Sequence, residues 1–150
     1  MKTVFDKATR EELISRINSL NENSSAQWGR MNIYQMLKHC LLWDEWVSGN
    51  KKYKQIFLGR LFGKRVLNNV LKDEKPLGRN SLTLPDFRIN KLGENRDIAS
   101  ERAKWIALME GYAHFSNPDF VHAFFGKMTK EEIGFLAYKH ADHHLRQFNA

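Results

Sequence analysis

The sequence has a single cysteine, no long apolar run and no secretory leader pattern. Because Cys40 has no partner for a disulfide within the chain, a reducing compartment is favoured over a disulfide-stabilised secreted scaffold. No apolar run approaches the roughly 20 residues that span a bilayer, and the first dozen residues lack the apolar stretch of a signal peptide. We therefore expect a soluble cytoplasmic protein with no membrane among its partners.

Several compact motifs of enzymes and metal sites are also missing. The sequence contains no His-Glu-x-x-His, no Cys-x-x-Cys, no Glu-x-x-His and no glycine-rich phosphate loop. These absences argue against zincin proteases, cysteine-based zinc sites, di-iron centres of the bundle type and P-loop nucleotide binding.

The bulk composition is that of an ordinary globular domain with one basic segment. The chain has 150 residues, of which 42% are hydrophobic and 27% charged, so one domain over residues 1–150 is expected. The net charge is +7, and residues 51–75 hold eight basic side chains against two acidic ones. Such a charge run is usually a solvated face, although it can also contact an acidic partner.

Apolar residues at helical spacing predict four main helices. The first begins near Asp6 or Thr9, where Thr9-x-x-Glu12 has the form of a capping box. Asn32 with Gln35 caps the second, and Thr129-x-x-Glu132 opens the last. The predicted ranges are residues 6–20, 32–47, 97–114 and 129–147.

Two intervening segments are less regular than these helices. Residues 54–72 can form a further helix, although their apolar side chains spread around most of the helical wheel. Residues 76–93 contain two prolines and no sustained period, which predicts a loop that could cover a site, with a short strand as an option over 81–90. The predicted fold is all-α, a four-helix bundle with an extra helical or irregular segment between its second and third helices.

The last helix carries the most informative pattern. At about 100° per residue, His140 and His144 fall one turn apart on the apolar stripe of this helix, whereas His143 falls at its edge. Two imidazoles at this spacing can reach one metal ion from the same side. A buried imidazole without a partner costs about 1–3 kcal/mol, so the pair favours metal binding over two unrelated core histidines.

A third ligand has to come from another part of the chain. His114 falls on the polar side of its helix, and nothing in the sequence fixes the position of His122 in the loop before the last helix. His39 flanks the apolar face of the second helix, where a bundle can bring it opposite the pair. A lone histidine in that position is more often a hydrogen-bonded core residue, so this reading stays open.

Two other residues of the second helix stand out. Asp44 lies within the apolar stripe, where a carboxyl group needs a hydrogen-bonding partner. Cys40 points about 100° away from His39 around the helix, so we expect it to pack as a small apolar residue and not to share a metal ion.

Three stretches of the chain resemble a known family. They are FDKATREELISRI, QWGRMNIYQMLKHC and FFGKMTKEEIGFLAYKHADHHLRQF, and they resemble the DinB/YfiT-like family, in a branch described only as a domain of unknown function. The resemblance covers nearly the whole chain, and His-x-x-His-His is its most specific part. It implies a four-helix bundle with a metal-binding triad that falls on His39, His140 and His144, with His143 outside the triad. Ala123 stands where relatives often have proline.

The resemblance also implies a kind of chemistry. Better-understood relatives are metal-dependent transferases or isomerases that use a low-molecular-weight thiol, so the chain is expected to activate a thiol or water for attack on a small electrophile. Zinc or nickel suits an all-histidine site best, and iron or manganese is an alternative. A homodimer is expected by the same resemblance. Further candidates for orienting a substrate or supporting the ligands are His122, His143, Arg146, Gln147 and the loop over 79–87.

A competing interpretation is a non-catalytic helical binding module. In that case the metal is structural or absent, and the basic segment 51–75 contacts an acidic partner. Phe57 and Phe62 lie among its basic residues, but base stacking needs exposed aromatic rings, and these two are equally compatible with the core. Nucleic acid is therefore not expected as the partner.

Overall fold

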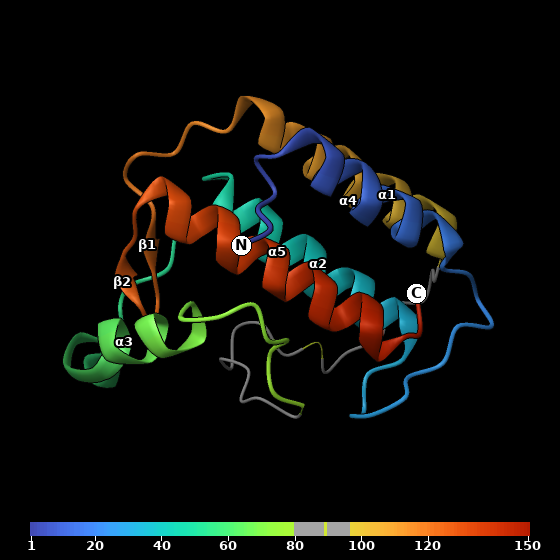
Figure 1. The fold of residues 1–150 in the computed structure, drawn as a ribbon. Helices are drawn as coiled ribbons and strands as arrows, with labels where there is room; N and C mark the ends of the chain where they lie inside the picture. Colours follow the sequence, from blue (N-terminus) through green and yellow to red (C-terminus); the bar gives the residue numbers. More distant parts are fainter. Residues whose placement is uncertain (80–88, 90–96) are drawn as a thin grey trace.

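The computed structural model describes residues 1–79, 89 and 97–150, and these residues are mostly helical (Figure 1). No helix in this described part of the chain combines the length and the apolar character needed to cross a bilayer. Its elements follow one another as α1 (Lys7–Ser19), α2 (Ile33–Val47), α3 (Phe57–Val70), α4 (Ile98–Gly111), the 3-10 helix η2 (Tyr112–His114), β1 (Val121–His122), β2 (Gly126–Lys127) and α5 (Lys130–Gln147).

The start of α1 differs in detail from the capping box expected at Thr9. The carboxylate of Asp6 accepts a hydrogen bond from the Thr9 main-chain amide at 3.0 Å, so Asp6 is the N-cap. Thr9 therefore lies inside the first turn, and its hydroxyl donates to the same carboxylate at 2.9 Å. An aspartate serves as well as a threonine at an N-cap, because its oxygen likewise accepts from the main-chain amide three residues on.

The two helices that matter most for the site begin where the sequence predicts. In α2, Asn32 and Gln35 form both hydrogen bonds of a capping box, and in α5 Thr129 and Glu132 do the same. Each box satisfies two main-chain amides that would otherwise lack a partner in the first turn. The residue at which each of these helices begins is thereby fixed.

Four helices pack together around the core. Helix α2 lies against α4 and α5, and α1 lies against the same two helices from the other side. Figure 1 shows α2 and α5 side by side through the middle of the molecule, with α1 and α4 as a second pair beside them. All four helices contribute to the largest fully buried side chains, which include Trp46, Trp105, Leu13, Ile17, Leu37, Met109 and Leu145.

The buried carboxyl group of Asp44 has the partners that its position requires. It accepts hydrogen bonds from Trp105 Nε1 at 2.8 Å and from the Tyr112 hydroxyl at 2.6 Å, which ties α2 to α4 and η2. Burial raises the pKa of Asp44 from 3.8 to about 6, and the two hydrogen bonds act in the opposite direction. Nearby Cys40 is fully buried, and its Sγ lies 3.6 Å from Met36 Sδ. It therefore packs in the core as a small apolar residue would.

The segment 54–72, for which the sequence predicts a further helix, contains α3. This helix packs on a short hairpin that was not predicted. Strands β1 and β2 pair in antiparallel fashion, and Gly126, with φ +78°, occupies a left-handed conformation at the start of β2. Gly59 and Gly63 face this hairpin, where a Cβ atom on either would collide with the Phe124 carbonyl oxygen. The strands escaped prediction because two residues are too few for an alternating pattern.

Parts of the predicted loop over 76–93 and of the optional strand over 81–90 lie outside the described residues. The described part of the loop, 76–79, contains no helix or strand. Ile89 is described, and its carbonyl oxygen accepts a hydrogen bond from Gln35 Nε2 at 3.0 Å.

The close contact of α3 with the hairpin predicts opposite effects for two Gly→Ala substitutions. Gly63→Ala places a methyl group against the main chain of Phe124 and should lower the free energy of unfolding by about 1–3 kcal/mol. Gly111→Ala is the matched control, since no atom lies within 4 Å of its Cβ position, and it should raise that free energy by up to about 1 kcal/mol. Urea unfolding measures the free energy of unfolding of both variants. Equal effects of Gly63→Ala and Gly111→Ala would contradict the close contact between Gly63 and Phe124.

The raised pKa of Asp44 predicts a pH-dependent difference between wild type and Asp44→Asn. Between pH 3.8 and about pH 6 the carboxyl group of Asp44 holds a proton in the folded state that it has lost in the unfolded chain. The stability that comes from this difference in pKa is complete below about pH 4 and is lost as pH rises through about 6. The free energy of unfolding of Asp44→Asn, relative to wild type, should increase by about 3 kcal/mol from pH 4 to pH 7. Urea titrations at both pH values test this, and a constant difference contradicts it.

Candidate metal centre

Three imidazole rings from two helices meet inside the molecule. His39 comes from α2, and His140 and His144 come from α5. Their ring centroids are separated by 5.0 Å, 4.7 Å and 4.7 Å, which makes a nearly equilateral triangle. One nitrogen from each ring lies within 4.8 Å of the other two, and the Nε2 atoms of His39 and His140 are 3.0 Å apart. The convergence expected from the sequence is therefore present.

The surroundings of the triangle keep it largely away from bulk water. His39 and His144 are 5% and 6% exposed, whereas His140 is partly exposed. The indole ring of Trp43, one turn after His39 on α2, stacks on His140 at 4.6 Å between centroids and 24° between planes. Stacking of this kind holds the imidazole plane in one orientation.

A hydrogen-bonded chain sets the tautomer of His144. The side-chain nitrogen of Gln147 donates to the Trp28 carbonyl oxygen at 2.8 Å, and because a carbonyl can only accept, the amide orientation is determined. Gln147 Oε1 then faces His144 Nδ1 at 2.9 Å, so Nδ1 must carry the hydrogen and donate it. The lone pair of His144 is thereby placed on Nε2, the nitrogen left for a metal.

Burial keeps the rings of His140 and His144 in the neutral form. It lowers the pKa of His140 well below its usual value, and the neighbouring rings of His144 and His39 act in the same direction. Burial likewise lowers the pKa of His144, with His39 adding to the effect and the hydrogen bond to Gln147 opposing it. Neutral imidazole is the form that binds metal ions, so protons compete weakly for this site near neutral pH.

The distances within the triangle fit a single divalent ion. Two nitrogens bound to one ion at roughly 2.0–2.1 Å lie about 3.0–3.4 Å apart, depending on the angle between the bonds. The separation of 3.0 Å between His39 and His140 falls in this range, and the nitrogen of His144 lies within 4.8 Å of both, so it would move inward to reach the same ion. Among the described residues no further histidine, cysteine or carboxylate joins the group.

Gln147 and Arg146, two residues proposed from the sequence to assist the site, have different surroundings. Gln147 is buried and holds His144, as described above. Arg146 is exposed, and its Nε donates to Asp142 at 2.7 Å. Asp142 also receives a hydrogen bond from Arg16 of α1 at 2.8 Å, so this carboxylate fastens α5 to α1. Arg146 therefore forms an ion pair with the carboxylate that links α5 to α1.

His143 lies beside the triangle but outside it. Its ring contacts His144 at 5.0 Å and Trp28 at 5.8 Å between centroids. The guanidinium group of Arg79 forms a cation–π contact with Trp28, with 4.5 Å between its carbon and the ring centroid. Burial lowers the pKa of His143, while a hydrogen bond with the Leu77 main chain acts against this. Of the predicted loop over 79–87, only Arg79 belongs to the described residues.

His122 is buried in a separate polar arrangement of the hairpin. Its Nδ1 accepts hydrogen bonds from the main-chain amides of Phe124 and Phe125 at 3.1 and 3.0 Å, so its hydrogen is on Nε2. Burial lowers the pKa of His122 to about 3, which keeps the ring neutral. Since its lone pair is used to close the hairpin, His122 is not part of the triangle.

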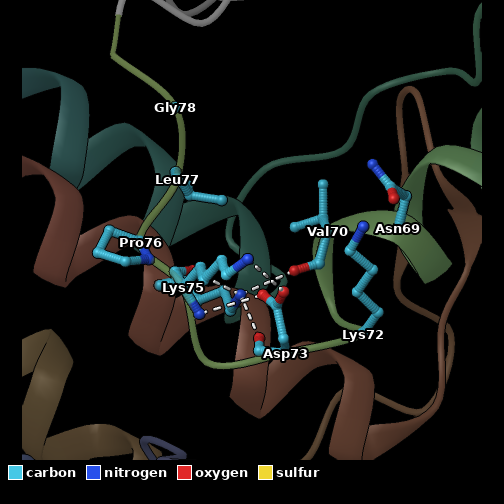
Figure 2. Close-up of a pocket in the computed structure, with 9 residues that line it drawn as sticks. Asn69, Val70, Lys72, Asp73, Lys75, Pro76, Leu77 and Gly78 are labelled. Carbon is cyan, nitrogen blue, oxygen red and sulfur yellow. Dashed lines mark hydrogen bonds and ion pairs between the residues drawn. The ribbon is translucent and has the colours of Figure 1, made fainter.

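Lys139, next to His140 in sequence, has a structural role that the sequence did not suggest. Its ammonium group is buried and donates to the carbonyl oxygens of Val70, Asp73 and Lys75 at 2.8, 2.7 and 2.9 Å (Figure 2). These bonds fasten the end of α3 and the following turn to α5. The adjoining open hollow of about 250 Å³ is lined by none of the three histidines, so it is separate from the candidate metal centre.

Comparison with known proteins places the chain in a family. The chain belongs to the family described as a protein of unknown function (DUF1569), whose model matches residues 5–150. This match includes all five α-helices and the three histidines. No curated protein and no solved structure matches the chain significantly.

The role of His122 predicts a stability effect that depends on its acceptor atom. His122→Leu leaves the amides of Phe124 and Phe125 without an acceptor and should lower the free energy of unfolding by about 1–3 kcal/mol. His122→Asn offers an oxygen close to the position of Nδ1 and should cost clearly less. Denaturant unfolding distinguishes the two, and equal losses would show that packing, not hydrogen bonding, is what His122 supplies.

Proposed function

We propose that this protein is a metal-dependent enzyme of the DinB/YfiT-like type, with α1, α2, α4 and α5 as its four-helix bundle. His39, His140 and His144 hold one divalent ion, zinc or nickel in first place and iron or manganese as alternatives. The substrate is a small electrophilic molecule, and the attacking group is a low-molecular-weight thiol or water. We further propose that the enzyme acts as a homodimer in the cytoplasm.

The observation that carries the proposal is the convergence of three imidazoles, one of which is oriented by Gln147. If the cluster were only a hydrogen-bonded part of the core, a proton between His39 and His140 would join two rings and leave His144 outside that bond. One cation would satisfy a lone pair on all three rings at once. The hydrogen bond from His144 Nδ1 to Gln147 matches the outer support that metal-binding histidines commonly have.

The geometry favours a reactive site over a closed structural one. When bound, a divalent ion on the nitrogens of His39, His140 and His144 would lower the pKa of a thiol or water in an open position and make it a nucleophile near neutral pH. The chain itself orients the rings through Gln147 and Trp43, and the stacked Trp43 ring keeps water from one side of His140. Arg79, held over Trp28, supplies a positive charge that can orient an anionic part of the substrate.

In the proposed reaction the chain holds two reactants close together. The thiol loses its proton to solvent, its sulfur forms a bond to the electrophilic carbon, and the leaving group departs with the electron pair of its broken bond. With water as the nucleophile the same sequence is a hydrolysis. Proximity and orientation supply much of the rate in either case.

A non-catalytic binding module remains the second candidate function, and one observation favours it. Helix α3, within the basic segment 51–75, exposes several large apolar side chains. In that function the metal is structural or absent, and the three histidines only stabilise the fold. Metal content and reactivity together separate the two functions.

The proposed metal centre predicts the metal content of three variants. Protein purified without chelator should contain about one divalent ion per chain, and His144→Ala should lose most of it because two imidazoles bind much more weakly than three. Gln147→Leu keeps all three ligands and should weaken metal affinity by roughly 10–100-fold through the lost support of His144. Elemental analysis and competition with a chromogenic chelator measure these quantities.

The matched control is His114→Ala, since His114 is exposed and belongs to η2. This variant should keep the full metal content and should conjugate thiols to a panel of small electrophiles as wild type does, whereas His144→Ala should not. Full metal content in a folded His144→Ala protein would remove the site. A full metal content in wild type without thiol transfer or hydrolysis would favour the structural role.

A further inference from the structure

Helix α3 has its small residues on the inner side and its large apolar residues on the outer side. Gly59, Gly63 and Leu67 are its buried residues, and both glycines lie against the main chain of Phe124. An ordinary surface helix has the reverse arrangement, with apolar side chains toward the core and polar ones toward solvent. Apart from Leu67 and the partly buried Val70, the large apolar residues of α3 are therefore not used to hold the helix on the rest of the protein.

The outward side chains form one apolar surface on α3, which we call the outer face. Its members include Phe57 and Phe62, whose position the sequence left open, and both rings are at the surface. The exposed fractions of its members are Ile56 40%, Phe57 72%, Leu58 58%, Leu61 60%, Phe62 54% and Val66 39%. Contiguous apolar surface of this kind usually marks an interaction site.

The outer face is surrounded by positive charge. Residues 51–72 include seven basic side chains and no acidic one. Arg60 and Arg65 are exposed, and neither forms an ion pair within the described part of the chain. Lys52 and Lys54, in the segment that leads into α3, are exposed as well. A partner of this surface must therefore offer both apolar groups and negative charge.

The helix is held firmly in this orientation. Its inner side is clamped on the hairpin through the two glycines, and its last turn is fastened to α5 by the hydrogen bond from Lys139 Nζ to the Val70 carbonyl at 2.8 Å. Figure 1 shows α3 at one end of the molecule, away from α1 and α4. A broad flat surface can therefore reach the outer face without meeting the four packed helices.

We propose that the outer face of α3 binds the surface of an anionic lipid bilayer. Phe57, Leu58 and Leu61 enter the boundary between headgroups and acyl chains, and the arginines and lysines contact lipid phosphates. A basic helix with aromatic and leucine side chains on its free face is the form that peripheral membrane contacts commonly take. The contact is peripheral and needs no spanning helix, and none is found among the described residues. The proposal departs from the expectation, made from the sequence, that no membrane is among the partners.

The same features argue against other partners. A second copy of the chain would bring two segments of the same positive charge together at this surface, which is unfavourable. Nucleic acid would use the aromatic rings for stacking but would leave the exposed aliphatic side chains of Leu58 and Leu61 without a role. A bilayer uses both the aliphatic and the aromatic groups, and its anionic headgroups use the cations.

Vesicle sedimentation tests the proposal with the full-length protein. Wild type should sediment with vesicles of phosphatidylcholine and phosphatidylglycerol and much less with phosphatidylcholine alone, and added salt should weaken the binding. The double variant Phe57→Ser, Leu61→Ser should reduce binding about tenfold or more, with thermal unfolding used to confirm that it folds. Arg65→Glu should also reduce binding about tenfold.

The matched charge control is Arg30→Glu, which makes the same change in net charge at an exposed residue outside the basic segment. It should bind vesicles nearly as wild type does. His144→Ala should also bind as wild type does, so the membrane inference and the proposed metal centre can fail separately.

Three results would overturn the inference. The first is no sedimentation with anionic vesicles, and the second is an equal loss of binding in Arg30→Glu and Arg65→Glu. The third is a dimer in analytical ultracentrifugation that dissociates in the Phe57→Ser, Leu61→Ser variant, because that result assigns the outer face to a second copy of the chain.

Discussion

The contact between α2 and α5 is the constraint on which the candidate site depends. His39 is carried by one helix and His140 and His144 by the other, so their nitrogens stay within 4.8 Å only while these helices keep their spacing and rotation. The buried side chains of Leu37 and Leu145, from the same two helices, belong to the core that maintains this spacing. Since protein cores are close-packed, a small change in that packing would be felt directly in the triangle.

Burial has opposite consequences for the basic and the acidic groups of the core, and both consequences follow from one cause. Transfer from water disfavours a charge of either sign, so the pKa of His144 falls and the pKa of Asp44 rises. Asp44 has Trp105 and Tyr112 as donors, which accounts for an acid within an apolar stripe. The core thus contains polar groups that are neutral or well satisfied. The triangle is the place where several lone pairs face one another.

Local signals predicted the helices well where a short-range bond decides the outcome. The capping boxes at Asn32 and Thr129 are formed, because each involves only residues three apart. Near the start of α1 the sequence has two possible N-cap side chains three residues apart, and the structure has Asp6, not Thr9, as the N-cap. The hairpin of β1 and β2 was missed, and so was the use of His122 to close it, because the hairpin is short and its setting depends on α3.

The sequence by itself determined that the chain is mostly helical, which face of α5 is apolar, and that His140 and His144 share that face, since all of these follow from periodicity within one helix. Only the tertiary structure decided that His39 completes the triangle and that Gln147 joins His144 to the Trp28 carbonyl. It also decided which side of α3 faces solvent. Apolar side chains around most of a helix do not reveal which of them will find a neighbour, because that depends on distant segments such as Phe124.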